Sequence, residues 1–122
     1  MSREIKFRGF NRKNGRWLYG YYLRNRGAHF VCADEFADGC SWEDYEIDPA
    51  SLGQFVGRED KNGREVYEGD IVYDGDTRYL VQWDSMDSCF ALKSKLSYRH
   101  LPILMRMSVE VVGNAYDNPD FF

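Results

Sequence analysis

Apolar and polar residues alternate near the N-terminus with a period of two, which is the pattern of a half-buried β-strand. In EIKFRGF, residues 4–10, apolar residues take every second position between charged ones. Asn14 and Gly15 follow, and these residue types tolerate the positive φ angles of a tight hairpin turn. The apolar stretch RWLYGYYL, residues 16–23, comes next. The pattern therefore predicts an N-terminal β-hairpin.

The predicted second strand of this hairpin is apolar on both faces. Its apolar residues are Trp17, Tyr19, Tyr21 and Leu23 on one side and Leu18 and Tyr22 on the other. A strand with two apolar faces is either central in the fold or part of a protein interface. The residues that we expect in the interface, if it exists, are Trp17, Tyr19, Tyr21 and Tyr22.

Turn signals recur in the middle of the chain, in GQFVGREDKNGREVYEGDIVYDGD, residues 53–76. The expected turns are centred on Asn62-Gly63, on Gly69-Asp70 and on residues 74–76. Gly63 and Gly69 are expected to adopt positive φ angles, which only glycine adopts without strain. Since short apolar runs lie between the turns, the stretch is interpreted as strands and hairpin turns and not as a chemical site.

Strand-like runs continue at residues 77–84, 88–93 and 108–113. Short strands separated by turns predict a mainly β fold, either a small barrel or a curled sheet. Helix signals are limited to single turns. One is expected at residues 48–53, where Asp48 can cap a turn that begins at Pro49, and a second at residues 94–100.

Length and composition fit one globular domain, since the chain has 122 residues of which 43% are apolar. No apolar run approaches the roughly 18 residues that cross a bilayer, and the N-terminus lacks the apolar core of a secretory signal. We therefore expect a cytoplasmic protein. Its three cysteines, Cys32, Cys40 and Cys89, are expected to be reduced thiols.

Charges are distributed unevenly, although the formal net charge is only −4. Residues 1–26 contain eight Lys or Arg and one Glu, whereas residues 34–48 contain seven Asp or Glu and no Lys or Arg. The asymmetry has three interpretations: two solvated surfaces, a basic face for nucleic acid, or self-complementary contacts between the two regions. A nucleic-acid face would use the basic residues Arg8, Arg12, Lys13 and Arg16, which are interleaved with aromatic residues.

Residue types that serve catalysis or metal binding occur, but none lies in a pattern that a known chemistry requires. Neighbouring carboxylates such as Glu59 and Asp60 are explained by the capping of tight turns. The two histidines, His29 and His100, have neither metal-ligand nor triad spacing, and no serine lies in a nucleophile elbow. We therefore expect no catalytic residues, no cofactor and no metal.

The middle stretch also carries a family resemblance. Residues 53–72 resemble the signature of the YopX family, small proteins encoded by phages and prophages of bacteria. The matching positions are Gly53, Gln54, Phe55, Gly57, Asp60, Lys61, Asn62, Gly63, Tyr67, Glu68, Gly69, Asp70, Ile71 and Val72. The opening REIKFRGF and the closing VEVVGNAYDNPDFF are also similar to the family. Gly9 departs from the pattern, because the family usually has Ala or a similar small residue there, and Val56 replaces a common Thr.

The resemblance implies a mainly β fold with a small SH3-like barrel, to which the residue pattern adds an N-terminal β-hairpin and at most short helical turns. It implies a single YopX-like domain over residues 1–122. Within it, residues 1–52 would form the hairpin and acidic loop region, and residues 53–122 a barrel-like region. It also implies expression inside a bacterial host, and it carries over no catalytic residues.

Three classes of function remain. The first is a non-catalytic phage or prophage accessory protein that binds a host protein, a phage protein or a second copy of itself. The alternative is a nucleic-acid-binding protein that uses the basic, aromatic N-terminal hairpin, although the overall acidity counts against it. An enzyme is the least expected class, because no constellation of residues supports it.

Overall fold

The computed structural model describes residues 4–33, 41–95, 98–99 and 108–120, and its fold is mainly β, as predicted. The chain divides into two compact units, Met1–Phe55 and Val56–Phe122. The single domain over residues 1–122, with a border after residue 52, stays a prediction. The helical elements in the described part of the chain are two short 3-10 turns, which agrees with the expectation of at most short helical turns.

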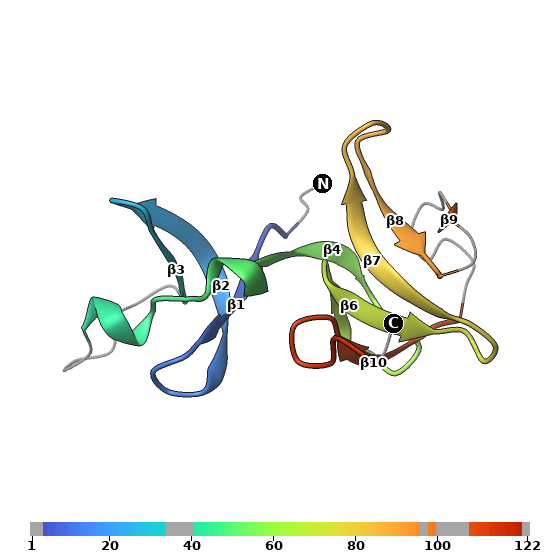
Figure 1. The fold of residues 1–122 in the computed structure, drawn as a ribbon, viewed down its shortest axis with the longest axis horizontal. Helices are drawn as coiled ribbons and strands as arrows, with labels where there is room; N and C mark the ends of the chain where they lie inside the picture. Colours follow the sequence, from blue (N-terminus) through green and yellow to red (C-terminus); the bar gives the residue numbers. More distant parts are fainter. Residues whose placement is uncertain (1–3, 34–40, 96–97, 100–107, 121–122) are drawn as a thin grey trace. The chain divides into compact units, whose positions relative to one another are not determined.

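The first unit contains an antiparallel meander (Figure 1). Its strands are β1 (Phe7–Asn11), β2 (Arg16–Asn25), β3 (Ala28–Cys32) and the beginning of β4 (Gly53–Glu59). The long strand β2 pairs with β1 through its first half and with β3 through its second half. On the other edge of β1, Phe7 pairs with Gln54 of β4. The predicted N-terminal hairpin is thereby confirmed.

A segment between β3 and β4 packs back onto the meander. It contains η1 (Trp42–Asp44) and η2 (Pro49–Ser51). The segment around Glu46 adds to β3 through hydrogen bonds from Val31 N–H to Tyr45 O and from Ile47 N–H to His29 O. The buried side chain of Ile47 lies against Gly9, where an added Cβ would come within 2.5 Å of Ile47 Cδ1. This contact explains why Gly9 carries no larger side chain.

The turn at η2 follows the predicted capping chemistry. The Asp48 carboxylate accepts a hydrogen bond of 3.1 Å from Ala50 N–H, and Pro49 occupies the first position of the turn. Ser51 then donates its hydroxyl to Asp48 O and accepts from Phe10 N–H at 2.7 Å. The turn is therefore fastened both to itself and to β1.

The second unit contains an antiparallel sheet of strand order β10-β6-β7-β8-β9 (Figure 1). The short strand β5 neighbours β4. The strands are β5 (Glu65–Tyr67), β6 (Asp70–Tyr73), β7 (Arg78–Asp84), β8 (Cys89–Lys93), β9 (Tyr98–Arg99) and β10 (Glu110–Asn114). One apolar cluster forms the core, made of Val66, Val72, Tyr79, Val81, Leu92, Val109 and Val111. The described strands do not close into a barrel, so the SH3-like barrel stays a prediction.

One local prediction is wrong. The helical turn expected within residues 94–100 does not form at Tyr98 and Arg99, which are the strand β9. These two residues pair with Lys93 and Leu92 of β8. Pairing with a neighbouring strand decides the conformation here, because the local helix signal in the sequence is weak.

The positive φ angles predicted for two turn glycines are confirmed, with φ of 83° at Gly63 and 93° at Gly69. Gly63→Ala is expected to lower stability by about 1 kcal/mol, because an alanine in this conformation is strained. An added Cβ would meet no atom within 4 Å, so the loss is conformational and not steric. Thermal unfolding should show a fall in Tm of roughly 4 °C. An unchanged Tm, with the exposed Glu59→Ala as control, would contradict this explanation of the turn.

Candidate functional site

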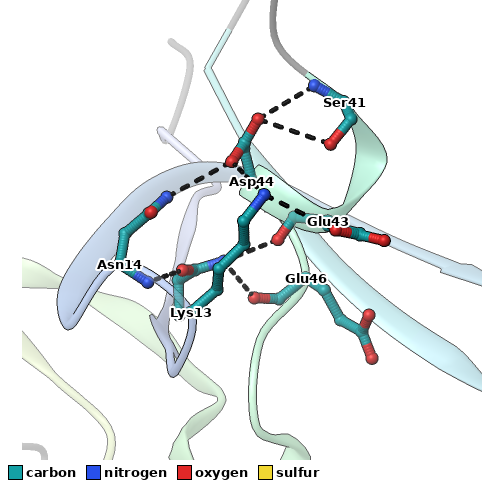
Figure 2. A network of polar contacts seen from close by, with 7 residues as sticks. Lys13, Asn14, Ser41, Glu43, Asp44 and Glu46 are labelled. Carbon is teal, nitrogen blue, oxygen red and sulfur yellow. Dashed lines mark hydrogen bonds and ion pairs between the residues drawn. The ribbon is translucent and has the colours of Figure 1, made fainter.

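Residues 41–48, which we call the acidic segment, dock onto the tip of the β1–β2 hairpin. Lys13 Nζ lies 3.0 Å from Asp44 Oδ1 and 3.5 Å from Glu43 Oε2. Arg12 forms an ion pair with Asp48. Figure 2 shows Lys13 and Asn14 reaching from the hairpin toward Asp44, while Ser41 approaches the same carboxylate from its own turn. Part of the charge asymmetry of the sequence is therefore compensated within the first unit.

Asn11 is the polar centre of this contact and is almost fully buried. Its Nδ2 donates to Glu43 O at 3.0 Å and to Glu46 O at 2.8 Å. Its Oδ1 accepts from Asn14 N–H at 2.7 Å. One amide thus holds both the hairpin turn and two carbonyls of the acidic segment, which fixes where the acidic side chains lie.

The ion pairs on this surface persist over a wide pH range. The backbone N–H of Ser41, together with Lys13, lowers the pKa of Asp44 to about 2. The hydrogen bond to Asp44 in turn raises the pKa of Lys13 above its ordinary value. A carboxyl with a lowered pKa keeps its charge until the pH falls through that pKa. Lys13 and Asp44 therefore remain oppositely charged at neutral and mildly acidic pH.

A groove of about 420 Å³ runs beside these ion pairs. Its lining residues are Asn11, Arg12, Lys13, Glu43, Glu46, Ile47, Asp48 and Pro49. Small-molecule pockets are mostly apolar with a few polar groups, whereas this lining is mainly charged and polar. In this lining Arg12 pairs with Asp48 and Lys13 with Glu43, so the groove is interpreted as the boundary between the hairpin and the acidic segment.

A different surface of the first unit exposes apolar side chains in a row. Tyr19, Tyr21 and Leu23 occupy alternate positions of β2, and their exposed fractions are 50%, 60% and 42%. Alternate side chains leave a strand on the same side. Ile5, 53% exposed, lines a groove of about 450 Å³ together with both tyrosines. We call Tyr19, Tyr21, Leu23 and Ile5 the exposed β2 face.

The four aromatic residues predicted for an interface have different environments. Tyr19 and Tyr21 belong to the exposed β2 face. Trp17 is half-buried, with its ring 5.5 Å from Phe10. Tyr22 is also half-buried and donates to or accepts from His29 Nδ1 through its hydroxyl at 2.6 Å. One part of β2 therefore packs inside the unit while another part is exposed, although the sequence analysis treated a core strand and an interface strand as alternatives.

The basic residues predicted for nucleic-acid contact are mostly engaged within the chain. Arg8 is only 5% exposed, and its guanidinium lies 4.9 Å from the centre of the Trp17 ring. Arg12 and Lys13 form the ion pairs with the acidic segment. Arg16 is exposed at the start of β2. The structure does not bring these four residues together as one uncompensated basic face.

The residues predicted to shape turns lie in turns or at strand ends. Gly15 donates its N–H to Asn11 O, and Asn62 donates its N–H to Asp60 Oδ1 at 2.8 Å. The buried Asp70 begins β6 and accepts from Tyr67 N–H at 2.7 Å. Sequence reasoning did not single out Asn11, although its position just before an Asn-Gly turn was a signal for such a role.

The described residues contain no group that could hold a metal ion. Within that part of the chain, no three His, Cys, Asp or Glu side chains are grouped as a metal site would require. Cys32 and Cys89 are free thiols, whereas Cys40 and His100 lie outside the described residues. Burial, with Asp84 and Asp87 nearby, raises the pKa of the Cys89 thiol. A raised pKa makes this thiol a poor nucleophile.

None of the helices among the described residues has the length and apolar character needed to span a bilayer. The absence of metal, cofactor and catalytic activity stays a prediction.

Comparisons with known proteins place the chain in a family. The crystal structure of protein EF1440 from Enterococcus faecalis is similar over 98% of each chain, with a TM-score of 0.58 and 22% sequence identity. At this identity the likeness concerns the fold alone. No curated protein sequence matches the chain. The family described as YopX protein matches residues 6–122, which is nearly the whole chain, and the chain therefore belongs to the YopX family.

Proposed function

We propose that this chain is a non-catalytic phage or prophage accessory protein that binds a protein partner through the exposed β2 face. The supporting observation is the row of Tyr19, Tyr21 and Leu23, each more than two-fifths exposed on one strand. Scattered apolar residues are normal on protein surfaces, but contiguous ones mark interaction sites. Tyrosine is also among the residues that contribute most to binding at interfaces.

The position of the face on a paired strand supports this function. The first half of β2 pairs with β1 and its second half with β3, so the row is held by backbone hydrogen bonds on a regular element. A preorganised surface loses little conformational entropy on binding. A partner that covers the two tyrosines would remove apolar area from water at about 25 cal/mol per Å².

The partner is a protein of the bacterial host or of the phage, and binding takes place in the host cytoplasm. A nucleic-acid partner is the alternative, which requires several uncompensated cations along one track. The ion pairs of Arg12 and Lys13 and the burial of Arg8 weaken that alternative.

A second copy of the chain is one protein partner that we include in the proposal. The acidic segment contacts Arg12 and Lys13 of its own chain, so opposite charges alone no longer argue for self-association. The exposed β2 face remains as an apolar surface that a symmetric dimer could bury. Light scattering at micromolar concentration, at low and moderate salt, measures this directly, and a monomer mass in both would remove self-association from the proposal.

Tyr21→Ala is expected to weaken partner binding by roughly thirtyfold or more, because truncation of a central interface aromatic costs about 2 kcal/mol or more. The matched control is Tyr73→Ala, which truncates another exposed tyrosine on a strand of the second unit. The measurement is affinity capture of the tagged protein from host cells with nuclease present, quantified against wild type. Equal losses in both variants, or none in Tyr21→Ala, would contradict the proposed surface.

A further inference from the structure

We propose that the exposed β2 face binds an extended acidic segment of a partner protein, and that Arg26 at the tip of the β2–β3 hairpin contacts its carboxylates. This inference rests on the proposed function, since it names the chemistry of the partner for the same surface. Three observations carry it: the backbone of Arg26, the arginines of residues 16–27, and the spacing of the exposed side chains.

The backbone at Arg26 is strained. Arg26 and Gly27 form a two-residue turn between paired Asn25 and Ala28, and their φ angles are 53° and 82°. A turn with positive φ at both central positions strongly prefers Asn, Asp or Gly at the first one. Arginine is disfavoured in this left-handed region, because its Cβ crowds the following carbonyl. Strained residues of this kind cluster at sites of function, so the identity of residue 26 points to a role for its side chain.

The arginines of residues 16–27 have no acidic partner among the described residues. Residues 16–27 contain Arg16, Arg24 and Arg26 and no acidic residue, and all three arginines are exposed. None of the three forms an ion pair within the described part of the chain. The tip of the β1–β2 hairpin is different, because Arg12 and Lys13 are paired there with acids. A complementary partner of the β2–β3 hairpin is therefore acidic.

The spacing of the exposed side chains fits an extended segment. Tyr19, Tyr21 and Leu23 follow one another at every second residue, which corresponds to about 7 Å along a strand. The side chains on one face of an extended partner segment repeat at the same distance. The groove bordered by Ile5 and Tyr21 gives one apolar side chain of the partner a place to enter, beside Glu4 and Lys6, which are paired with each other. Carboxylates at the end of such a segment would meet Arg26.

A protein segment fits this surface better than single-stranded nucleic acid. Nucleic acid needs cations along the whole backbone and aromatic planes for successive bases. The three arginines lie at the two ends of the strand, and Arg24 leaves β2 on the opposite side from Tyr21 and Leu23. The aliphatic residues of the face, Leu23 and Ile5, offer no plane on which a base could stack.

The test uses the full chain and four fluorescent probes in anisotropy titrations. The first is a peptide of about ten residues, the length that follows β2, in which Glu alternates with Leu and Phe. The second and third have Lys or Gln in place of every Glu, and the fourth is an oligothymidylate of similar length. We expect the Glu peptide to bind tightest and to weaken as salt screens the exposed charges.

Arg26→Asn separates the role of the side chain from that of the backbone. Asparagine tolerates the left-handed conformation, so the variant should fold with an unchanged Tm or one raised by about 2 °C. Affinity for the Glu peptide should nevertheless fall roughly threefold to fivefold, as expected for the loss of one exposed charge contact. Lys95→Gln, which removes one exposed charge from the second unit, should leave the affinity unchanged.

Four outcomes would overturn the inference, and they differ in what they say of the proposed function. Equal affinity for the Glu and Gln peptides, with loss of both in Tyr21→Ala, would leave the surface as a protein site without acidic preference. Tightest binding of the Lys peptide would reverse the inferred charge. Tightest binding of oligothymidylate would replace protein by nucleic acid and overturn the proposed function too. Failure of every probe to bind would reject the inference that the partner presents an extended acidic segment. The capture experiment would still decide the proposed function.

Discussion

Asp60→Asn is expected to destabilise residues 56–122 by about 2–3 kcal/mol, because it breaks a buried, charge-assisted hydrogen bond between the Asp60 turn and β10. Asp60 Oδ1 accepts from Asn62 N–H at 2.8 Å and from Arg64 N–H at 2.9 Å, and Oδ2 accepts from Val111 N–H at 2.9 Å. An asparagine keeps one oxygen for the turn. Its NH₂ group would then face Val111 N–H, so two hydrogen-bond donors would oppose each other and the bond from Val111 N–H would be lost. The measurement is urea unfolding at pH 7.

The same carboxylate gives the second unit an acid-sensitive stability. Burial is the largest influence on Asp60 and raises its pKa, but the N–H groups of Val111, Arg64 and Asn62 together outweigh it, so the pKa lies below 3.8. A lowered pKa stabilises the fold fully above the unfolded value and loses that contribution as pH falls through the folded value. Wild type should therefore lose stability below about pH 4, and Asp60→Asn should lose less over the same range.

Asp74→Asn is the matched control for this prediction. Asp74 Oδ1 also accepts from two N–H groups of its own turn, those of Asp76 and Thr77. It also forms a side-chain hydrogen bond with Tyr79 of the adjacent strand β7, but it accepts no N–H from β10. An asparagine oxygen can replace it in the turn, and the expected loss is below about 1 kcal/mol. A loss as large as that of Asp60→Asn would show that capping of any turn, and not the hydrogen bond to β10, controls the stability. Hydrogen exchange at Val111 would locate the effect.

The turns of this fold were predictable because their chemistry is local. An Asn-Gly pair or a lone glycine between apolar runs requires positive φ at a particular position, and Gly63 and Gly69 adopt it. The strands between the turns follow from alternation, which depends on neighbours two residues away. The wrongly predicted helical turn at Tyr98–Arg99 is the exception, because the local sequence does not reveal that these residues pair with β8.

The candidate site was predictable only in part, because it depends on residues far apart in the chain. The sequence marked the tyrosines of β2 as core or interface, but only their exposure in the fold separates Tyr21 from Tyr22. It marked the basic and acidic regions, but not that Lys13 meets Asp44, 31 residues away. Arg26 was not singled out, because its importance lies in a backbone angle that the folded hairpin imposes.

Asn11→Asp is expected to cost the first unit about 3 kcal/mol or more, although the side chain keeps its size. The buried amide donates two hydrogen bonds, to Glu43 O and Glu46 O. A carboxylate keeps the bond from Asn14 N–H but turns an oxygen toward two carbonyl oxygens. The acceptors would repel each other in a site that excludes water, so the acidic segment should detach from the hairpin or the carboxyl should bind a proton.

The two responses differ in their dependence on pH, and both are measurable. If the carboxyl of the variant is forced to stay buried, its pKa rises, so the variant should regain stability as the pH falls through that raised value. Asn25→Asp makes the same replacement at an exposed position of β2 and should cost less than about 0.5 kcal/mol. Urea unfolding followed by hydrogen exchange at Val31 and Ile47, which bond across the segment, would report detachment. Equal stability of Asn11→Asp and Asn25→Asp at pH 7 would mean that the ion pairs of Arg12 and Lys13, and not the amide of Asn11, hold the acidic segment in place.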